Sequence, residues 1–198
     1  MKKKFYLLAC LFTLGTSLNF IGCNSAPSPA APVTLTAPVP TPTPFCASPS
    51  FQGLTAFASN SYSTGYLNTQ AVTLASAETA TGISVYVGSG PVTGQIRFGI
   101  YNNTAGGVFP GNLIIETLPQ NLVASSWNSA SFPNVYLPAG IYWLAFNESN
   151  NFNIYYNNLG GTNQYITNFG WAAFPVSYPT VPGAWDQYVL SFYLIICP

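Results

Sequence analysis

The chain has 198 residues, of which 48% are hydrophobic, 16% aromatic and only 4% charged, and it contains no histidine. This length fits one domain with a sizeable core. The low charge excludes a basic nucleic-acid-binding protein, and the lack of histidine excludes Ser–His–Asp and Cys–His active sites.

The first segment, residues 1–22, is predicted to be an export signal. Lys2–Lys4 form a positive start, and a largely apolar stretch follows at 5–21. The stretch ends in Phe20-Ile21-Gly22-Cys23, which resembles the lipobox of bacterial lipoproteins, with Phe20 standing where leucine is usual. The resemblance implies that Cys23 is lipidated and holds the mature protein at a membrane of the cell envelope, facing the periplasm or the exterior.

Two other fates of this segment stay open. Cleavage just after Ser25 would release a secreted protein, and an uncleaved segment would act as a short membrane anchor. Both the lipoprotein and the secreted protein would be exported.

Residues 24–45 are predicted to be an extended tether that begins at the lipidated Cys23. Seven of these residues are proline, and proline removes backbone donors and holds φ near the polyproline value. We therefore expect the tether to space a domain at 46–198 from the membrane; a proline-rich ligand for a partner is the alternative.

The domain at 46–198 is predicted to be all-β. Residues 83–87 and 95–101 alternate between apolar and polar with a period of two, and no stretch shows a sustained helical period. Further strands are expected at 67–74, 113–118, 129–136, 140–147, 152–157, 164–169 and 188–197. About eight to ten short strands separated by turn residues predict an antiparallel β-sandwich of the jelly-roll type.

One part of the domain is similar to a known kind of module. The likeness covers residues 65–147 and rests on Gly99–Asn103, Pro110–Ile114, Ser126–Asn128 and Ala139–Phe146. This run resembles jelly-roll β-sandwich modules appended to bacterial and archaeal secreted or surface proteins. Because it consists of turns and core positions, it implies a fold and no active site.

Two cysteines remain in the exported domain, Cys46 at its start and Cys197 near its end. In an exported chain such a pair is most simply a structural disulfide. The bond requires the first and last strands to be neighbours; two buried thiols are the alternative.

Few ionisable side chains are available for chemistry. If 95–101 and 113–118 form a hairpin in which paired residue numbers sum to 213, Arg97 faces Glu116 in a cross-strand ion pair. A two-carboxylate glycosidase built from Glu116, Glu148 and Asp186 is the remote enzymatic alternative, and it needs two of them about 5–10 Å apart. We otherwise expect no catalytic residues and no cofactor.

Residues 147–151 cluster oxygen-bearing side chains in a predicted turn. They include a single carboxylate, Glu148, and lack the alternating aspartates of strong calcium loops. A polar hairpin loop is therefore favoured over a calcium site, and no metal is expected.

Aromatic residues carry the strongest remaining signal, above all in the segment 169–188. Trp171, Tyr178, Trp185 and Asp186 stand there among prolines, glycines and amides, which is a composition suited to sugar recognition. The favoured interpretation is nevertheless that the segment folds its aromatics over the sandwich as a satellite core, and a ligand platform is the alternative.

Two other aromatic groups complete the set of candidates. Tyr155, Tyr156 and Asn157 form a second, weaker candidate site. Tyr142, Trp143 and Phe146 alternate along one strand, so one face of that strand is expected in the core and the other partly exposed.

The sequence thus predicts an exported, lipid-anchored, non-catalytic β-sandwich that displays a binding or adhesion surface, with a glycan or another surface protein as partner. A structural, self-associating envelope protein is the alternative, since 46–198 contains no lysine to protect its edge strands and homo-oligomers are then expected.

Overall fold

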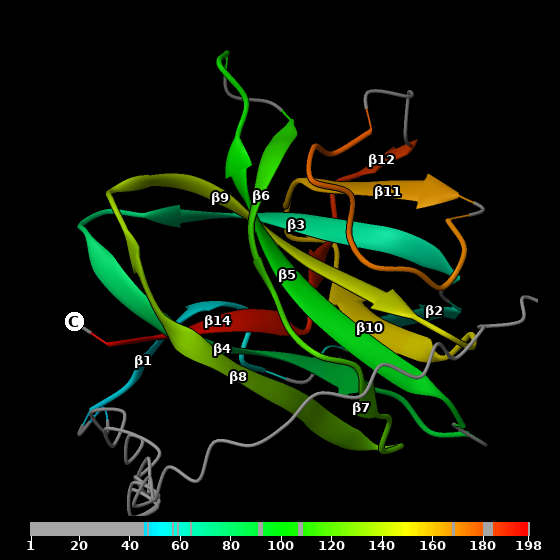
Figure 1. Cartoon of the computed structure of the whole chain (residues 1–198). Helices are drawn as coiled ribbons and strands as arrows, with labels where there is room; N and C mark the ends of the chain where they lie inside the picture. Colours follow the sequence, from blue (N-terminus) through cyan, green and yellow to red (C-terminus); the bar gives the residue numbers. More distant parts are fainter. Residues whose placement is uncertain are drawn as a thin grey trace, which may run out of the picture. The chain divides into compact units, whose positions relative to one another are not determined.

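The structure is a computed structural model that describes residues 46, 48–56, 58, 60–63, 65–90, 93–106, 109–167, 169–179 and 184–197, with only the backbone for residues 62, 63, 66, 184 and 185. The export signal at 1–22, Cys23 and the tether lie outside the described residues. Within the described part the chain forms two antiparallel sheets and no helix, as the sequence predicts (Figure 1). The described residues therefore contain no helix that is long and apolar enough to cross a membrane.

The first sheet, which we call sheet A, has the order β1-β14-β4-β10-β13, with β8 paired to β4 and β2 paired to β10. Its strands are β1 (Ser50–Gly53), β2 (Asn60–Ser63), β4 (Glu78–Val87), β8 (Ser126–Leu137), β10 (Asn153–Asn157), β13 (Val189–Leu190) and β14 (Phe192–Cys197).

The second sheet, sheet B, has the order β12-β11-β3-β9-β5-β6, with β7 paired to β5. Its strands are β3 (Tyr66–Leu74), β5 (Gln95–Asn103), β6 (Pro110–Glu116), β7 (Gln120–Asn121), β9 (Gly140–Glu148), β11 (Asn163–Thr167) and β12 (Ala184–Asp186). Each segment expected to be extended overlaps one of these fourteen strands, and the last, 188–197, is divided between β13 and β14.

The main core lies between the two sheets and follows from the period of two. On β4, Val85 and Val87 point inward, and on β5, Phe98 and Ile100 do the same. Phe192 of β14 meets both Phe98 and Phe146, with ring centroids 6.3 Å and 5.4 Å away. Burial of these alternate side chains holds the sheets face to face.

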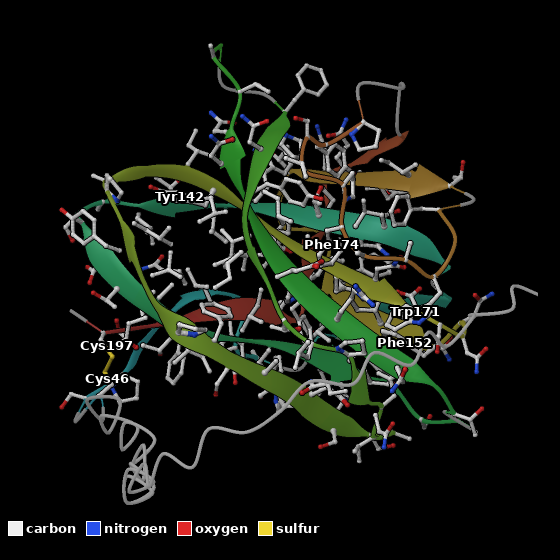
Figure 2. All side chains as sticks on the ribbon, viewed as in Figure 1. Cys46, Tyr142, Phe152, Trp171, Phe174 and Cys197 are labelled. Carbon is white, nitrogen blue, oxygen red and sulfur yellow. A yellow bond between two sulfur atoms is a disulfide. The ribbon has the colours of Figure 1, made fainter. Side chains whose placement is uncertain are left out.

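The disulfide between Cys46 and Cys197 is confirmed, with the two Cα atoms 5.8 Å apart (Figure 2). β1 pairs antiparallel with β14, where Ser50 faces Ile196, so the first and last strands are neighbours as the bond requires. The disulfide closes a loop over a sequence separation of 151 residues and ties the edge strand β1 to the body of sheet A.

Candidate functional site

The two outer faces of the sandwich offer the candidate sites, and on sheet B that face is covered. Residues 169–179, which we call the strap, cross it and bury a second core against it. This outer core consists of Leu67, Tyr101, Trp143, Ala145, Phe174 and Tyr178. Gly99 makes the approach possible, because a Cβ atom there would lie 2.8 Å from the Phe174 ring.

Hydrogen bonds fix the strap to the strands beneath it. The Leu113 backbone NH donates to the Val176 carbonyl at 2.8 Å, and the Tyr178 NH donates to the Gly111 carbonyl at 2.8 Å. The Tyr101 hydroxyl donates to the Pro175 carbonyl at 3.0 Å. The strap therefore extends the edge of sheet B beside β6 and satisfies its own backbone groups.

Arg97 and Glu116 form the expected ion pair, with Nη1 and Oε2 3.7 Å apart. The expected register is wrong, because two irregularities in the β5–β6 ladder move Gly99, not Arg97, opposite Glu116. Arg97 lies two residues before Gly99 on the same face of β5, and its side chain reaches Glu116 diagonally. Glu116 also accepts a 2.9 Å hydrogen bond from the Phe174 NH, so this carboxylate is part of the strap's attachment.

Trp171 is half-buried and lies over Arg97, with the guanidinium carbon 4.7 Å from the ring centroid. Figure 2 shows Trp171 and Phe174 together in the strap, close to β5. One face of the Trp171 ring is thus occupied by the cation, a contact of the cation–π type. Trp171 secures one end of the strap.

Tyr178 does not present a surface for a ligand, because it is only 5% exposed and packs edge to face on Tyr101 at 5.4 Å. Burial raises the pKa values of both tyrosines, and the neighbouring Tyr178 and Glu116 raise that of Tyr101 further. The Tyr178 ring therefore belongs to the outer core, which agrees with the satellite-core interpretation of this segment.

The same layer corrects the expectation of an exposed face on β9. Tyr142 and Phe146 face the main core, whereas Trp143 points to the opposite side and is only 1% exposed. The Trp143 indole NH donates to Asn103 Oδ1 at 3.0 Å. β9 is buried on both faces because the strap supplies a third layer there.

Asp186 and Trp185 lie in β12, at the far edge of sheet B. Asp186 pairs with Asn163 and Trp185 with Gln164, and the Trp185 side chain is outside the described residues. Burial raises the pKa of Asp186. Trp171, Tyr178 and Asp186 therefore belong to three different settings and do not form one surface.

The three carboxylates of the enzymatic alternative are also separated. Glu148 faces Ile96 on the inner side of sheet B, whereas Glu116 faces Gly99 on the outer side. Asp186 lies three strands from Glu148 in the order β12-β11-β3-β9. Neighbouring strands are about 4.8 Å apart, so the distance between Asp186 and Glu148 exceeds the roughly 5–10 Å that separate the two carboxylates of a glycosidase.

The turn at 147–151 is hydrogen-bonded to the first residue of β5 and to the segment before it. Ser149 Oγ accepts from the Gln95 NH at 2.8 Å, and Asn150 Nδ2 donates to the Thr93 carbonyl at 2.6 Å. These contacts are those of a polar loop. Among the described residues, no group of three or more His, Cys, Asp or Glu side chains is placed to hold a metal ion.

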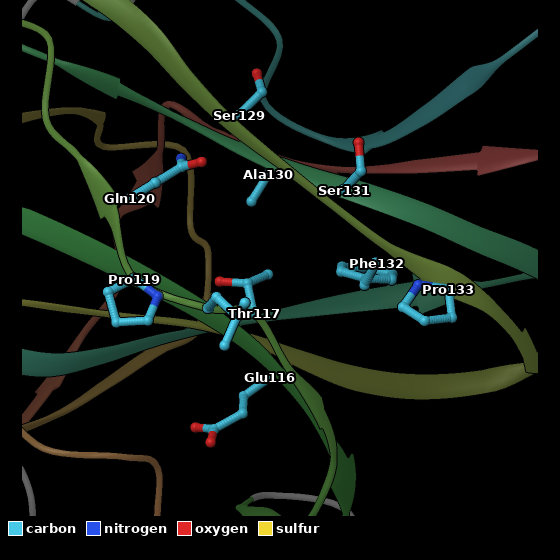
Figure 3. A pocket seen from close by; sticks show the side chains of 10 residues that line it. Glu116, Thr117, Pro119, Gln120, Ser129, Ala130, Ser131, Phe132 and Pro133 are labelled. Carbon is cyan, nitrogen blue, oxygen red and sulfur yellow. The ribbon is translucent and has the colours of Figure 1, made fainter. Parts of the chain in front are cut away.

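A cavity of about 440 Å³ opens between β8 and the segment 116–120 (Figure 3). Ala130 and Phe132 point from β8 toward Thr117, and Ser129 and Ser131 point away. Glu116 is the only charged residue in its lining. Since Glu116 is bonded to Arg97 and the strap, the cavity contains no free pair of catalytic groups.

The outer face of sheet A has a different character, because a row of aromatic rings crosses it. Phe51 contacts Tyr193 at 5.2 Å between centroids, and Tyr193 contacts Trp127 at 4.8 Å. Trp127 contacts Tyr86 at 5.5 Å, and Tyr86 contacts Tyr155 at 5.6 Å. We call these five residues the aromatic row.

The aromatic row is accessible and surrounded by uncharged groups. Phe51 is 48% exposed, and the other four side chains are half-buried. The Ser84 hydroxyl, opposite Tyr193, is within 2.7 Å of the Ser129 hydroxyl. Across β1, β4, β8, β10 and β14 the only charged residue is Glu78, at the far end of β4 from Tyr86.

Only one member of the row was among the sequence-based candidates, Tyr155 in the weaker group. A signal for two others is present in the alternation: Tyr86 lies between Val85 and Val87, and Tyr193 between Phe192 and Leu194. Large aromatics at outward positions indicate a displayed surface. The alternation does not show that these rings contact one another across the strands.

Comparison with known proteins adds little to this geometry. No protein-family model matches the chain, and no curated protein matches it. A solved structure of the infectious bursal disease virus Gx strain is similar over 76% of this chain and 33% of that chain, with 14% identity and a TM-score of 0.31. The chain thus spans about a third of that viral chain's length, and a likeness at this level supports no functional argument.

Proposed function

We propose that this protein is an exported, lipid-anchored and non-catalytic β-sandwich that binds neutral glycans through the aromatic row. The observation that carries the proposal is the row itself, five contacting rings on an exposed and uncharged sheet face. Sugar rings carry apolar CH faces and hydroxyl edges, so aromatic faces bordered by hydroxyls and amides complement them.

The lipid anchor at Cys23 and the tether at 24–45 fit this function. They would present the domain away from the membrane, where an insoluble ligand is accessible. The disulfide supports an oxidising compartment.

A jelly-roll arrangement is part of the proposal. The order β1-β14-β4-β8 in sheet A and the order β3-β9-β5-β6 in sheet B support it. Eight strands interleaved in this way correspond to two Greek keys. The aromatic row then lies on the sheet that contains both the first and the last strand.

The test is a pull-down of the full-length protein on an insoluble neutral β-glucan. Trp127→Ala should weaken retention at least tenfold, which corresponds to about 1.4 kcal/mol. Tyr136→Ala is the matched control, because Tyr136 is 70% exposed on the same strand, on the order of 25 Å from Trp127.

Two results would overturn the proposal. One is equal retention of the wild type and Trp127→Ala. The other is a wild-type dimer that Trp127→Ala converts to a monomer in sedimentation analysis without any glycan binding, since this would assign the row to self-association.

A further inference from the structure

The direction of the aromatic row carries information about its ligand. Its rings come from five different strands, in the order β1, β14, β8, β4 and β10. Three of the rings cross the sheet, Phe51 on β1, Tyr193 on β14 and Trp127 on β8, because β4 lies between β14 and β8. At β8 the row turns back over β4 to Tyr155 on β10, which lies on the same side of β4 as β14. A ligand that contacts both Phe51 and Trp127 must extend over most of the width of sheet A, from β1 to β8.

The rings are held in place before any ligand arrives. Trp127 contacts both Tyr86 and Tyr193, and it is paired across the β4–β8 ladder with Tyr86. Ser84, the ladder partner of Tyr193, is fully buried on this face beneath the rings. Packed rings lose little side-chain entropy on binding, so each contact is available at low cost.

The row lies on a sheet face, and the cavity of Figure 3 is lined by none of its residues. A single terminal sugar is recognised by groups that surround it, whereas a flat series of rings offers one weak contact per ring. Weak contacts in series favour a ligand that repeats, because each later contact forms within an already bound complex.

Resting on the proposed function, we infer that the ligand is an extended, uncharged polysaccharide chain that lies across the strands, with several sugar units stacked on the row at once. Trp127 and Phe51 are the two ends of this span, Tyr193 lies between them, and Trp127 is the main anchor because it also contacts Tyr86. The ligand is recognised along its length and not at its terminus. The neutrality follows from the single charged residue in the five strands, Glu78, which stands eight residues from Tyr86.

The experiment measures the affinity of the full-length protein for soluble β-1,4-linked glucose oligomers, from the disaccharide to the hexasaccharide. We expect affinity to rise with chain length. Phe51→Ala removes the end of the span farthest from Trp127, so it should lower the hexasaccharide affinity about three- to tenfold and leave the disaccharide affinity unchanged. Tyr136→Ala should have no effect at any length.

Three outcomes would overturn this inference while leaving neutral-glycan binding intact. The first is equal affinity for all lengths, and the second is equal loss of short and long ligands in Phe51→Ala. The third is equal binding of a coiled α-1,4-linked glucose oligomer of the same length. If no oligomer and no insoluble glucan binds, the proposed function itself fails.

Discussion

The outer faces of the two sheets have similar sequence patterns but differ in how far their aromatic side chains are buried. Both sheets carry large aromatics at outward positions: Tyr101 and Trp143 on sheet B, and Tyr86, Trp127 and Tyr193 on sheet A. On sheet B the strap covers them and forms an outer core. On sheet A the rings of the aromatic row contact one another and remain partly exposed. An outward-facing aromatic is therefore structural or displayed according to whether another segment covers it, and not according to composition.

Loss of the disulfide should have the largest effect. In a Cys46→Ser/Cys197→Ser variant we expect the free energy of unfolding to fall by about 4 kcal/mol, because the closed loop spans 151 residues. β1 should loosen first, and Phe51 with it. Urea unfolding with and without reductant measures this, and reductant should leave the double variant unchanged.

Phe174→Ala should remove the support of the covered face. The ring is buried between Gly99 and Tyr101, so its loss should cost about 3 kcal/mol. Val176→Ala is the matched control, since Val176 is 79% exposed in the same strap and its loss should change stability by less than about 0.5 kcal/mol. Equal stability of the two variants would show that the strap does not form a core.

Alkaline pH should act on the covered face through Tyr101 and Tyr178. Their pKa values are raised by folding, so the folded state retains protons that the unfolded state loses above about pH 10. Stability is then fully present below that pH and falls as pH rises further, by at most about 1.4 kcal/mol per pH unit for each tyrosine. Urea unfolding between pH 8 and 11, a range about the tyrosine pKa, should show a shallower decline for Tyr101→Phe/Tyr178→Phe.

Glu116→Gln should weaken the strap's attachment by about 1 kcal/mol, because it removes the charge from the hydrogen bond to the Phe174 NH and from the Arg97 pair. Glu78→Gln, on sheet A, serves as the control carboxylate. Hydrogen exchange at the Phe174 amide is the direct measurement. An unchanged exchange rate in Glu116→Gln would contradict the assigned role.

Phe51→Ala should have the smallest effect on stability, below about 1 kcal/mol, because the ring is half exposed and contacts Tyr193 at one end of the row. Together with Phe174→Ala it gives the sharpest form of the comparison. Phe174→Ala should lower the free energy of unfolding, whereas Phe51→Ala should lower glycan binding. Urea unfolding of both variants beside the glucan pull-down measures the two effects.

Sequence patterns were sufficient to predict most of the strands, although not β1, β2, β7 and β12, together with the two-sheet architecture and the pairing of Cys46 with Cys197. These follow from local properties: the period of two, the turn residues and the count of cysteines in the exported domain. The sequence also identified Arg97 and Glu116 as partners, since few other charges exist. The ladder near the turn keeps the expected register at Asn103 and Pro110, and only the irregularities beyond it change the pairing.

The tertiary structure alone decided which aromatics are covered. Whether Trp143 and Tyr178 are buried depends on where the strap crosses, and that in turn depends on Gly99, Glu116 and the edge of β6. The aromatic row is likewise invisible along the chain, because its members lie on strands far apart in sequence. Sequence alternation fixes the side of a sheet on which a residue lies, whereas the neighbours it meets there are set by the order of the strands.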